Sequence, residues 1–84
     1  MARIIENERK NLIGENLKRI RAEKRLSQRA LSCKLELLGV YICRGSISRI
    51  EDYSRTVTDI ELVAIAKAVH VSVDELVDNS FFEL

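Results

Sequence analysis

One helix-start pattern recurs four times in this chain and constrains its fold more than any other feature. In each copy a polar or small residue has an apolar residue just before it and another four positions after it, the spacing of a hydrophobic staple around a helix N-cap. The apolar pairs are Leu26 with Leu31, Ile42 with Ile47, Val57 with Leu62, and Val71 with Leu76, around Ser27, Cys43, Thr58 and Ser72 respectively. The pattern therefore predicts four closely spaced helices.

Two of these starts carry a second signal. The third residue after Thr58 is Glu61, and the third after Ser72 is Glu75. Both pairs fit a capping box, in which the two side chains satisfy otherwise unpaired backbone N–H groups at the helix start.

A further helix precedes the four. Ile13, Leu17 and Ile20 recur at helical spacing and define one apolar face. The predicted helices lie near residues 11–24, 28–38, 44–51, 59–69 and 73–78. Gly39 ends the second, where a left-handed conformation is easiest for glycine. The fourth is apolar on nearly every side, which is typical of a central helix wrapped by the others.

The composition agrees with an all-α fold in one small domain. The chain has 84 residues, no proline and three glycines, which leaves little room for long irregular linkers. We therefore expect a compact five-helix domain over residues 1–84, with a core at about 11–78 and a C-terminal tail at 79–84.

Several functional classes are disfavoured by what the sequence lacks. It contains no nucleotide-binding glycine run, catalytic signature or metal-ligand spacing, so we expect no enzyme, cofactor or metal site. Cys33 and Cys43 are the only cysteines and are expected to stay reduced. No apolar run is long enough to cross a membrane, and the predicted location is the cytoplasm.

Charge is distributed unevenly along the chain. The net charge is +1, but residues 1–35 carry ten basic and four acidic side chains, whereas residues 58–84 carry one basic and six acidic ones. Such asymmetry favours a basic face for a polyanion, although a dipolar soluble surface is the simpler interpretation.

The predicted helix at 44–51 is the best candidate for recognition. A helical wheel places Ile47 and Ile50 on the buried side and Gly45, Ser48 and Arg49 opposite, with Arg44 and Ser46 on the flanks. Arginine and serine can donate to guanine or phosphate, and glycine lets the backbone approach a groove closely. A solvated face with a tolerated glycine is the alternative.

Two charged residues border the apolar stripes of different helices. Arg21 lies beside the stripe of the first helix, and Glu51 lies beside that of the third. We predict that they form a partly buried ion pair that fixes the third helix against the first.

The runs LSQRAL, ISRIE and VTDIELVAIAKAVHVSVDELV together resemble the Cro and phage-repressor type of helix-turn-helix domain, the XRE-like group. The resemblance covers about residues 13–77. It implies a lambda-repressor-like five-helix fold whose third helix lies in the major groove of double-stranded DNA.

The resemblance also implies roles for individual residues. It matches Gln28 to a residue that touches phosphate and buttresses the recognition helix, and Arg21 and Glu51 to an ion pair. The positions that face the operator correspond to Cys43, Arg44, Gly45, Ser46 and Arg49, with Arg44 and Arg49 as base readers.

This sequence departs from the family pattern in three places. About five extra residues separate Gln28 from Glu51, in LELLGVY, and they lengthen either the second helix or its turn. Cys43 replaces the usual serine or threonine N-cap. One hypothesis is that its thiol is sensitive to oxidation at this position, and the simpler one is that a small residue is tolerated at the cap. The loop EDYSRTVTD lacks the usual glycine and proline, and its Arg55 is a candidate phosphate contact.

The expected function is a sequence-specific transcriptional regulator, a repressor that reads a palindromic operator as a homodimer. The apolar tail, Phe81, Phe82 and Leu84, is the expected dimer seam, with folding back over the last helices as the alternative. A protein-interaction adaptor or antitoxin-like module, acting through the acidic C-terminal helices and this tail, is the rival function.

Overall fold

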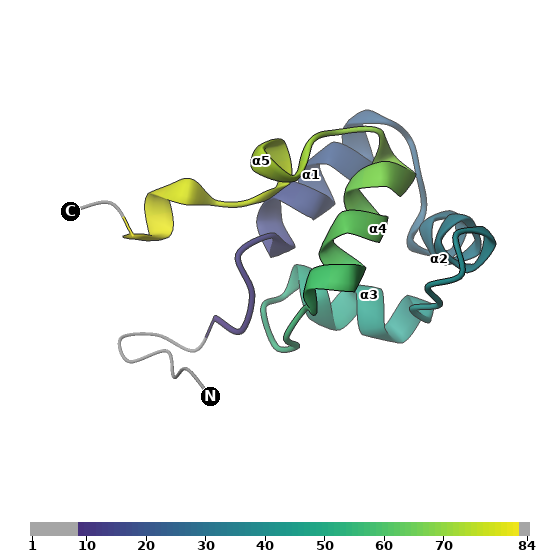
Figure 1. The fold of residues 1–84 in the computed structure, drawn as a ribbon, viewed down its shortest axis with the longest axis horizontal. Coiled ribbons are helices and arrows are strands. Elements are labelled where there is room, and N and C mark those ends of the chain that lie inside the picture. The colour runs from purple at the N-terminus through teal and green to yellow at the C-terminus, as the bar shows by residue number, and fades with distance from the viewer. Residues whose placement is uncertain (1–8, 83–84) are drawn as a thin grey trace.

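The structure is a computed structural model that describes the backbone of residues 9–82 and the side chains of residues 9–80. It is all-α within that range, as predicted, and Figure 1 shows its helices packed around one another. The helices are α1 (Gly14–Glu23), α2 (Gln28–Leu37), α3 (Arg44–Glu51), α4 (Asp59–Val69) and α5 (Val73–Leu76), followed by the 3₁₀ helix η1 (Asn79–Phe82). The five-helix prediction is confirmed. The tail side chains proposed as a dimer seam lie outside the described residues.

The N-caps set the helix starts. Ser27 Oγ accepts a hydrogen bond from the Ala30 N–H, and Thr58 and Ser72 each complete the expected capping box. Cys43 precedes α3 in extended conformation but makes no side-chain bond to the backbone of the first turn. Helices α2 to α5 therefore begin at the predicted residues.

Helix α1 starts three residues later than expected because Asn11 caps the segment before it. The Asn11 side-chain oxygen accepts hydrogen bonds from the N–H groups of Ile13 and Gly14, both at 2.9 Å. Its Nδ2 donates to the carbonyls of Ile50 and Arg55, at 3.0 and 2.8 Å. One buried amide thus joins the start of α1 to the end of α3 and the loop beyond it.

Helix α5 is shorter than the expected 73–78. The chain becomes extended at Val77, and the Asp78 N–H donates to the Leu12 carbonyl at 2.7 Å. The C-terminal segment is therefore attached to the residues that lead into α1.

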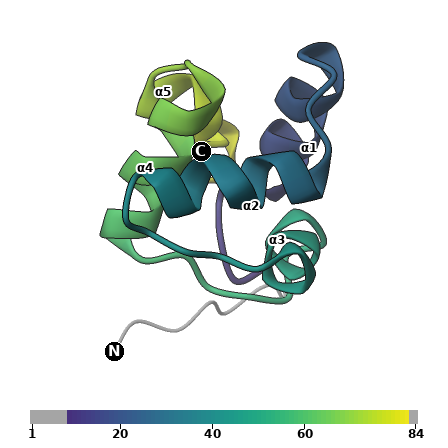
Figure 2. The same ribbon diagram turned by 90° about the vertical axis from the view of Figure 1, so that its right-hand side faces the viewer.

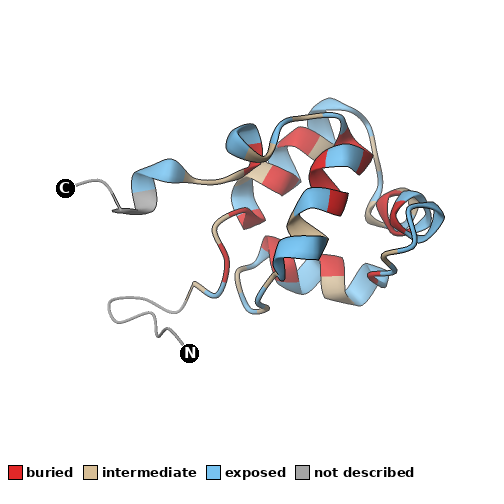
Figure 3. Ribbon diagram, viewed as in Figure 1, coloured by how far each residue is buried: buried red, intermediate tan, exposed pale blue. Residues whose placement is uncertain are grey.

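The core gathers the apolar faces predicted from the sequence. Ile13, Leu17 and Ile20 of the α1 segment are buried, as are Ile47 and Ile50 of α3. Figure 3 shows the buried residues facing inward on each helix. Complete burial of one such side chain contributes about 1.5 to 3 kcal/mol, so these faces fix how the helices pack.

The run LELLGVY, which holds the five surplus residues, lies partly in the last turn of α2 and partly in the connection after it. Helix α2 ends at Leu37, and Gly39 adopts the expected left-handed conformation, with φ of +83°. Residues 38–43 then form the connection to α3. Figure 2 shows α2 lying across the molecule, with α3 beneath one end and α4 at the other.

Helix α4 is not wrapped on every side, contrary to expectation. Its inner residues, among them Ile65 and Val69, are buried, but Ile60 and Val63 remain 67% and 45% exposed. An apolar stripe on its outer side therefore has no cover among the described residues. None of the helices in the described range is long and apolar enough to cross a membrane.

Candidate nucleic-acid interface

Helix α3 exposes the side that the helical wheel predicted. Ile47 and Ile50 are fully buried, whereas Arg44, Gly45 and Arg49 are exposed to solvent, as is Ser48. Both guanidinium groups therefore point away from the core. We call Arg44, Gly45, Ser48 and Arg49 the recognition face.

A short polar chain runs along the flank of α3. The Cys43 thiol donates to Ser46 Oγ at 3.4 Å, and Arg49 Nη2 donates to the same oxygen at 3.1 Å. The hydrogen bond with the Ser46 side chain is the main reason that the pKa of Cys43 is lowered, and the Arg49 charge adds to it. Ser46 thus connects the N-cap thiol to the arginine one turn later.

The glycine in the first turn of α3 has no packing reason within the described protein. A Cβ added at Gly45 would meet only Arg49 Nη1, at an ordinary contact distance of 3.7 Å. Glycine within a helix costs about 1 kcal/mol relative to alanine. The backbone at Gly45 is therefore bare on the outer surface of α3.

A second glycine determines how closely α1 approaches α3. A Cβ at Gly14 would lie 2.6 Å from the Ile50 carbonyl oxygen and 3.0 Å from that of Glu51. The backbones of the two helices therefore touch at this point. This requirement for glycine at position 14 is not visible in the sequence, since it comes from residues more than 35 positions away.

Arg21 and Glu51 lie in contact and position α3. Arg21 Nε lies 2.7 Å from Glu51 Oε2, and its Nη2 donates to Oε1 at 3.0 Å. The side chains are 16% and 5% exposed. The hydrogen bond to Glu51 is the largest cause of the raised pKa of Arg21, which further donates to the Leu26 carbonyl at 2.9 Å.

Gln28 joins the same carboxylate. Its Nε2 donates to Glu51 Oε1 at 3.0 Å, so the first residue of α2 is tied to the last residue of α3. Gln28 is half-buried. This hydrogen bond connects α2 to α3, and the phosphate contact that the family resemblance implied for Gln28 stays a prediction.

Arg55 is occupied within its own loop. Its two terminal nitrogens bind the Glu61 carboxylate at 3.1 and 2.9 Å, and Nη1 also donates to the Thr56 carbonyl at 2.9 Å. This pairing with Arg55 is the first cause of the lowered pKa of Glu61. In this structure Arg55 stabilises the loop and the start of α4, and a phosphate contact would compete with Glu61 for its guanidinium.

Two further residues lie close to the two ends of α3 and were not singled out from the sequence. Arg29, the second residue of α2, lines a surface hollow with Arg44, Gly45 and Cys43. Its place next to Gln28 on an exposed helical turn was the available signal. Tyr53, after α3, has left-handed backbone and accepts a hydrogen bond from Arg9 Nη2 at 2.8 Å.

Arg9 connects Tyr53 to Asp78, in the segment after α5. The Arg9 guanidinium lies 4.2 Å from the centre of the Tyr53 ring and 3.0 Å from the Asp78 carboxylate. The loop after α3, the segment before α1 and the segment after α5 thus meet at one arginine.

Comparison with known proteins identifies the fold. No family model matches the chain, and neither does any curated protein. A solved structure described as the crystal structure of the DNA-binding domain of BldD matches with a TM-score of 0.68 and 25% sequence identity, over 87% of this chain and 99% of that one. The chain therefore has the lambda-repressor-like fold of the XRE-type helix-turn-helix domains, with α2 and α3 as the helix-turn-helix pair.

Proposed function

We propose that this protein is a sequence-specific DNA-binding transcriptional regulator, a repressor that places α3 in the major groove. One observation carries the proposal. The recognition face presents two exposed arginines, a serine and a bare glycine backbone without a carboxylate, while two buried isoleucines hold the helix from behind. The similarity in fold to the DNA-binding domain of BldD supports it.

The residues around α3 divide into two roles in this proposal. Arg44 and Arg49 read bases, because a guanidinium can donate twice to the O6 and N7 of guanine. Gln28, Cys43 and Ser46 contact the sugar-phosphate backbone. Gly45 permits close approach, and Arg29 adds positive charge beside Arg44.

The binding test begins with selection of bound fragments from a random duplex pool. We expect a palindromic site whose half-sites lie about 34 Å apart, since a two-fold dimer would read both. The affinity of Arg49→Ala for the selected site is then measured by fluorescence anisotropy. We expect a loss of about 1 to 3 kcal/mol and relaxed preference at one base pair, because a base-reading arginine has been removed.

Arg19→Ala is the matched control. Arg19 lies on α1 in an exposed pair with Glu23 at 3.2 Å, away from the recognition face. Its removal should leave base preference unchanged. Equal losses for both variants on every duplex would contradict the proposal. If the chain binds a partner protein but is not retained on duplex DNA at low salt, the adaptor function is favoured instead.

A further inference from the structure

Four of the large exposed apolar side chains of this protein lie on the outer side of α4 and at the end of α2, whereas Tyr41 lines the hollow beside Arg44 and Gly45. Among the described residues, the large apolar side chains that remain exposed are Leu37, Leu38, Tyr41, Ile60 and Val63, with exposed fractions from 45% to 88%. All belong to the end of α2, the turn after it, or the outer side of α4. A gathering of this kind on a small domain marks an interaction surface.

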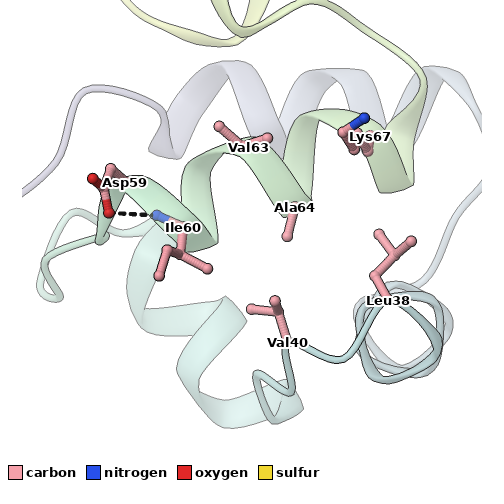
Figure 4. A pocket seen from close by; sticks show the side chains of 7 residues that line it. All are labelled: Leu38, Val40, Asp59, Ile60, Val63, Ala64 and Lys67. Atoms are coloured by element: carbon pink, nitrogen blue, oxygen red, sulfur yellow. Dashed lines mark hydrogen bonds between the residues drawn. The ribbon is translucent and has the colours of Figure 1, made fainter.

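The centre of this surface is a shallow apolar groove beside α4. Leu38 and Val40, in the connection between α2 and α3, lie across from Ala64. Ile60 and Val63 flank Ala64 along the helix (Figure 4). We call these five residues the α4 groove. The small side chain of Ala64 leaves space between the two rows, so a protruding side chain can enter.

The two ends of the groove carry opposite charges. Asp59 lies at one end and Lys67 at the other, eight residues or about 12 Å further along the helix. One Asp59 oxygen accepts the Ile60 N–H at 2.7 Å. Neither Asp59 nor Lys67 has an ion-pair partner within residues 9–82.

The described C-terminal segment does not cover the groove. Figure 1 shows η1 leading away from α2 and α4 toward the opposite end of the long axis. The occupant therefore has to be sought outside the described part of this molecule.

We propose that the α4 groove is a homodimer interface in which the α4 helices of two copies pack antiparallel about a two-fold axis near Val63 and Ala64. A two-fold rotation brings the same surface of both copies together, and an axis perpendicular to α4 reverses the direction of the second helix. Asp59 then lies opposite Lys67 of the partner subunit, and Lys67 opposite the partner subunit's Asp59. The groove is thus complementary to its own copy in charge as well as in apolar character.

The spacing of the stripe suits this arrangement. Ile60, Val63, Ala64 and Lys67 follow one another at intervals of three, one and three residues, which places them on a single face of α4. Antiparallel packing pairs the apolar positions in the middle and the charged positions at the ends. The recognition face shares no residue with the groove, so both α3 helices remain exposed in the dimer.

The test is a charge reversal followed by its exchange, measured without DNA by sedimentation equilibrium at low salt. Lys67→Asp sets two carboxylates against each other at both ends of the interface, and we expect the dimer dissociation constant to rise about tenfold. The double variant D59K/K67D restores opposite charges across the axis and should return the constant to within about threefold of the original. Lys18→Asp, on α1, changes the net charge equally and should leave the constant unchanged.

A second variant tests the apolar centre and does not depend on the charges. Val63→Asp places a carboxylate at the two-fold axis and should yield a monomer, while thermal unfolding verifies that each variant remains folded. A wild-type chain that is monomeric at millimolar concentration would overturn the proposal. So would a dimer that survives V63D, or one that is lost only in F81S/F82S. Because no DNA is present, none of these results bears on DNA recognition.

Discussion

Glu51 is the residue on which the position of α3 most depends. Its carboxylate, 5% exposed, accepts hydrogen bonds from both Arg21 and Gln28 and so connects α3 to α1 and to α2. Removing one partner of a buried pair leaves the other charge without compensation, which costs more than the pair itself contributes. The ion pair therefore acts chiefly as a positioning device.

Glu51→Gln should lower the free energy of unfolding by about 2 to 3 kcal/mol, somewhat less than for a fully buried pair because Arg21 keeps some contact with water. Urea denaturation measures the change. Glu23→Gln, which removes the exposed partner of Arg19, should cost at most about 0.5 kcal/mol. Equal and small effects of both changes would show that the buried network does not hold α3.

Glu61 makes the stability of the folded protein depend on pH. Pairing with Arg55 lowers the pKa of Glu61 in the folded protein, so its contribution to stability is present above the ordinary glutamate pKa of 4.5 and is lost as the pH falls below that value toward the folded pKa. Glu61→Gln retains an amide oxygen for the capping box but removes the charge. We expect thermal unfolding below about pH 4.5 to become less steeply pH-dependent in this variant. An unchanged slope would contradict the assignment.

Cys43 should react with electrophiles faster than Cys33. Both thiols are exposed, but hydrogen bonding with Ser46 lowers the pKa of Cys43 and raises its thiolate fraction near neutral pH. Alkylation by iodoacetamide, followed by mass spectrometry of each cysteine peptide, compares the two sites in one molecule. Faster labelling of Cys33 would show that the Ser46 contact does not activate the thiol.

A DNA-binding titration tests the redox hypothesis for Cys43. DNA affinity that is unaffected by mild peroxide would contradict that hypothesis.

At the scale of elements, glycine sets the distance between α1 and α3. Gly14 allows the two backbones to touch, whereas a Cβ at Gly45 would make only an ordinary contact with Arg49 Nη1. The same substitution at these two positions should therefore have opposite effects on stability.

Gly14→Ala should destabilise the protein by about 1 to 3 kcal/mol, because α1 and α3 must move apart to admit the Cβ. Gly45→Ala should raise stability by about 0.5 kcal/mol through helix propensity alone, while weakening DNA binding if the bare backbone meets a groove. Chemical denaturation and anisotropy measure the two quantities on each variant. A Gly45→Ala protein with unchanged affinity would remove Gly45 from the interface.

The helix starts were predictable because capping is a local property. Thr58 with Glu61 and Ser72 with Glu75 lie three residues apart, and both boxes are present in the structure. The start of α1 was placed too early because Asn11 finds its partners 39 and 44 residues away. The partner of Arg55 was missed although only six residues separate it from Glu61, since either a phosphate or a carboxylate satisfies an arginine.

The exposed stripe of α4 could not be read from its composition. A helix that is apolar all round shows which side chains favour burial, but it does not say which side lacks a neighbour. That side is determined by the connection between α2 and α3, because its residues Leu38 and Val40 border the outer side of α4 without covering Ile60.

At the scale of the whole molecule, the uneven distribution of charge bears on the proposed binding of DNA. Ten of the fourteen basic residues lie within residues 1–35, whereas residues 58–84 carry one basic and six acidic side chains. If a dimer neutralises about six phosphates, the slope of log affinity against log salt should be near −5. Anisotropy titrations at several salt concentrations measure it. A slope near zero would exclude a phosphate-dominated complex.

The residues of α3 that attach the helix to the core are different from the residues that it exposes to solvent. Its last residue, Glu51, and two isoleucines fix the helix from one side, whereas the four residues of the recognition face contact nothing in the core. Exchanging the three side chains Arg44, Ser48 and Arg49 for others should therefore leave the scaffold intact, so that variation at these positions is separated from variation in the fold.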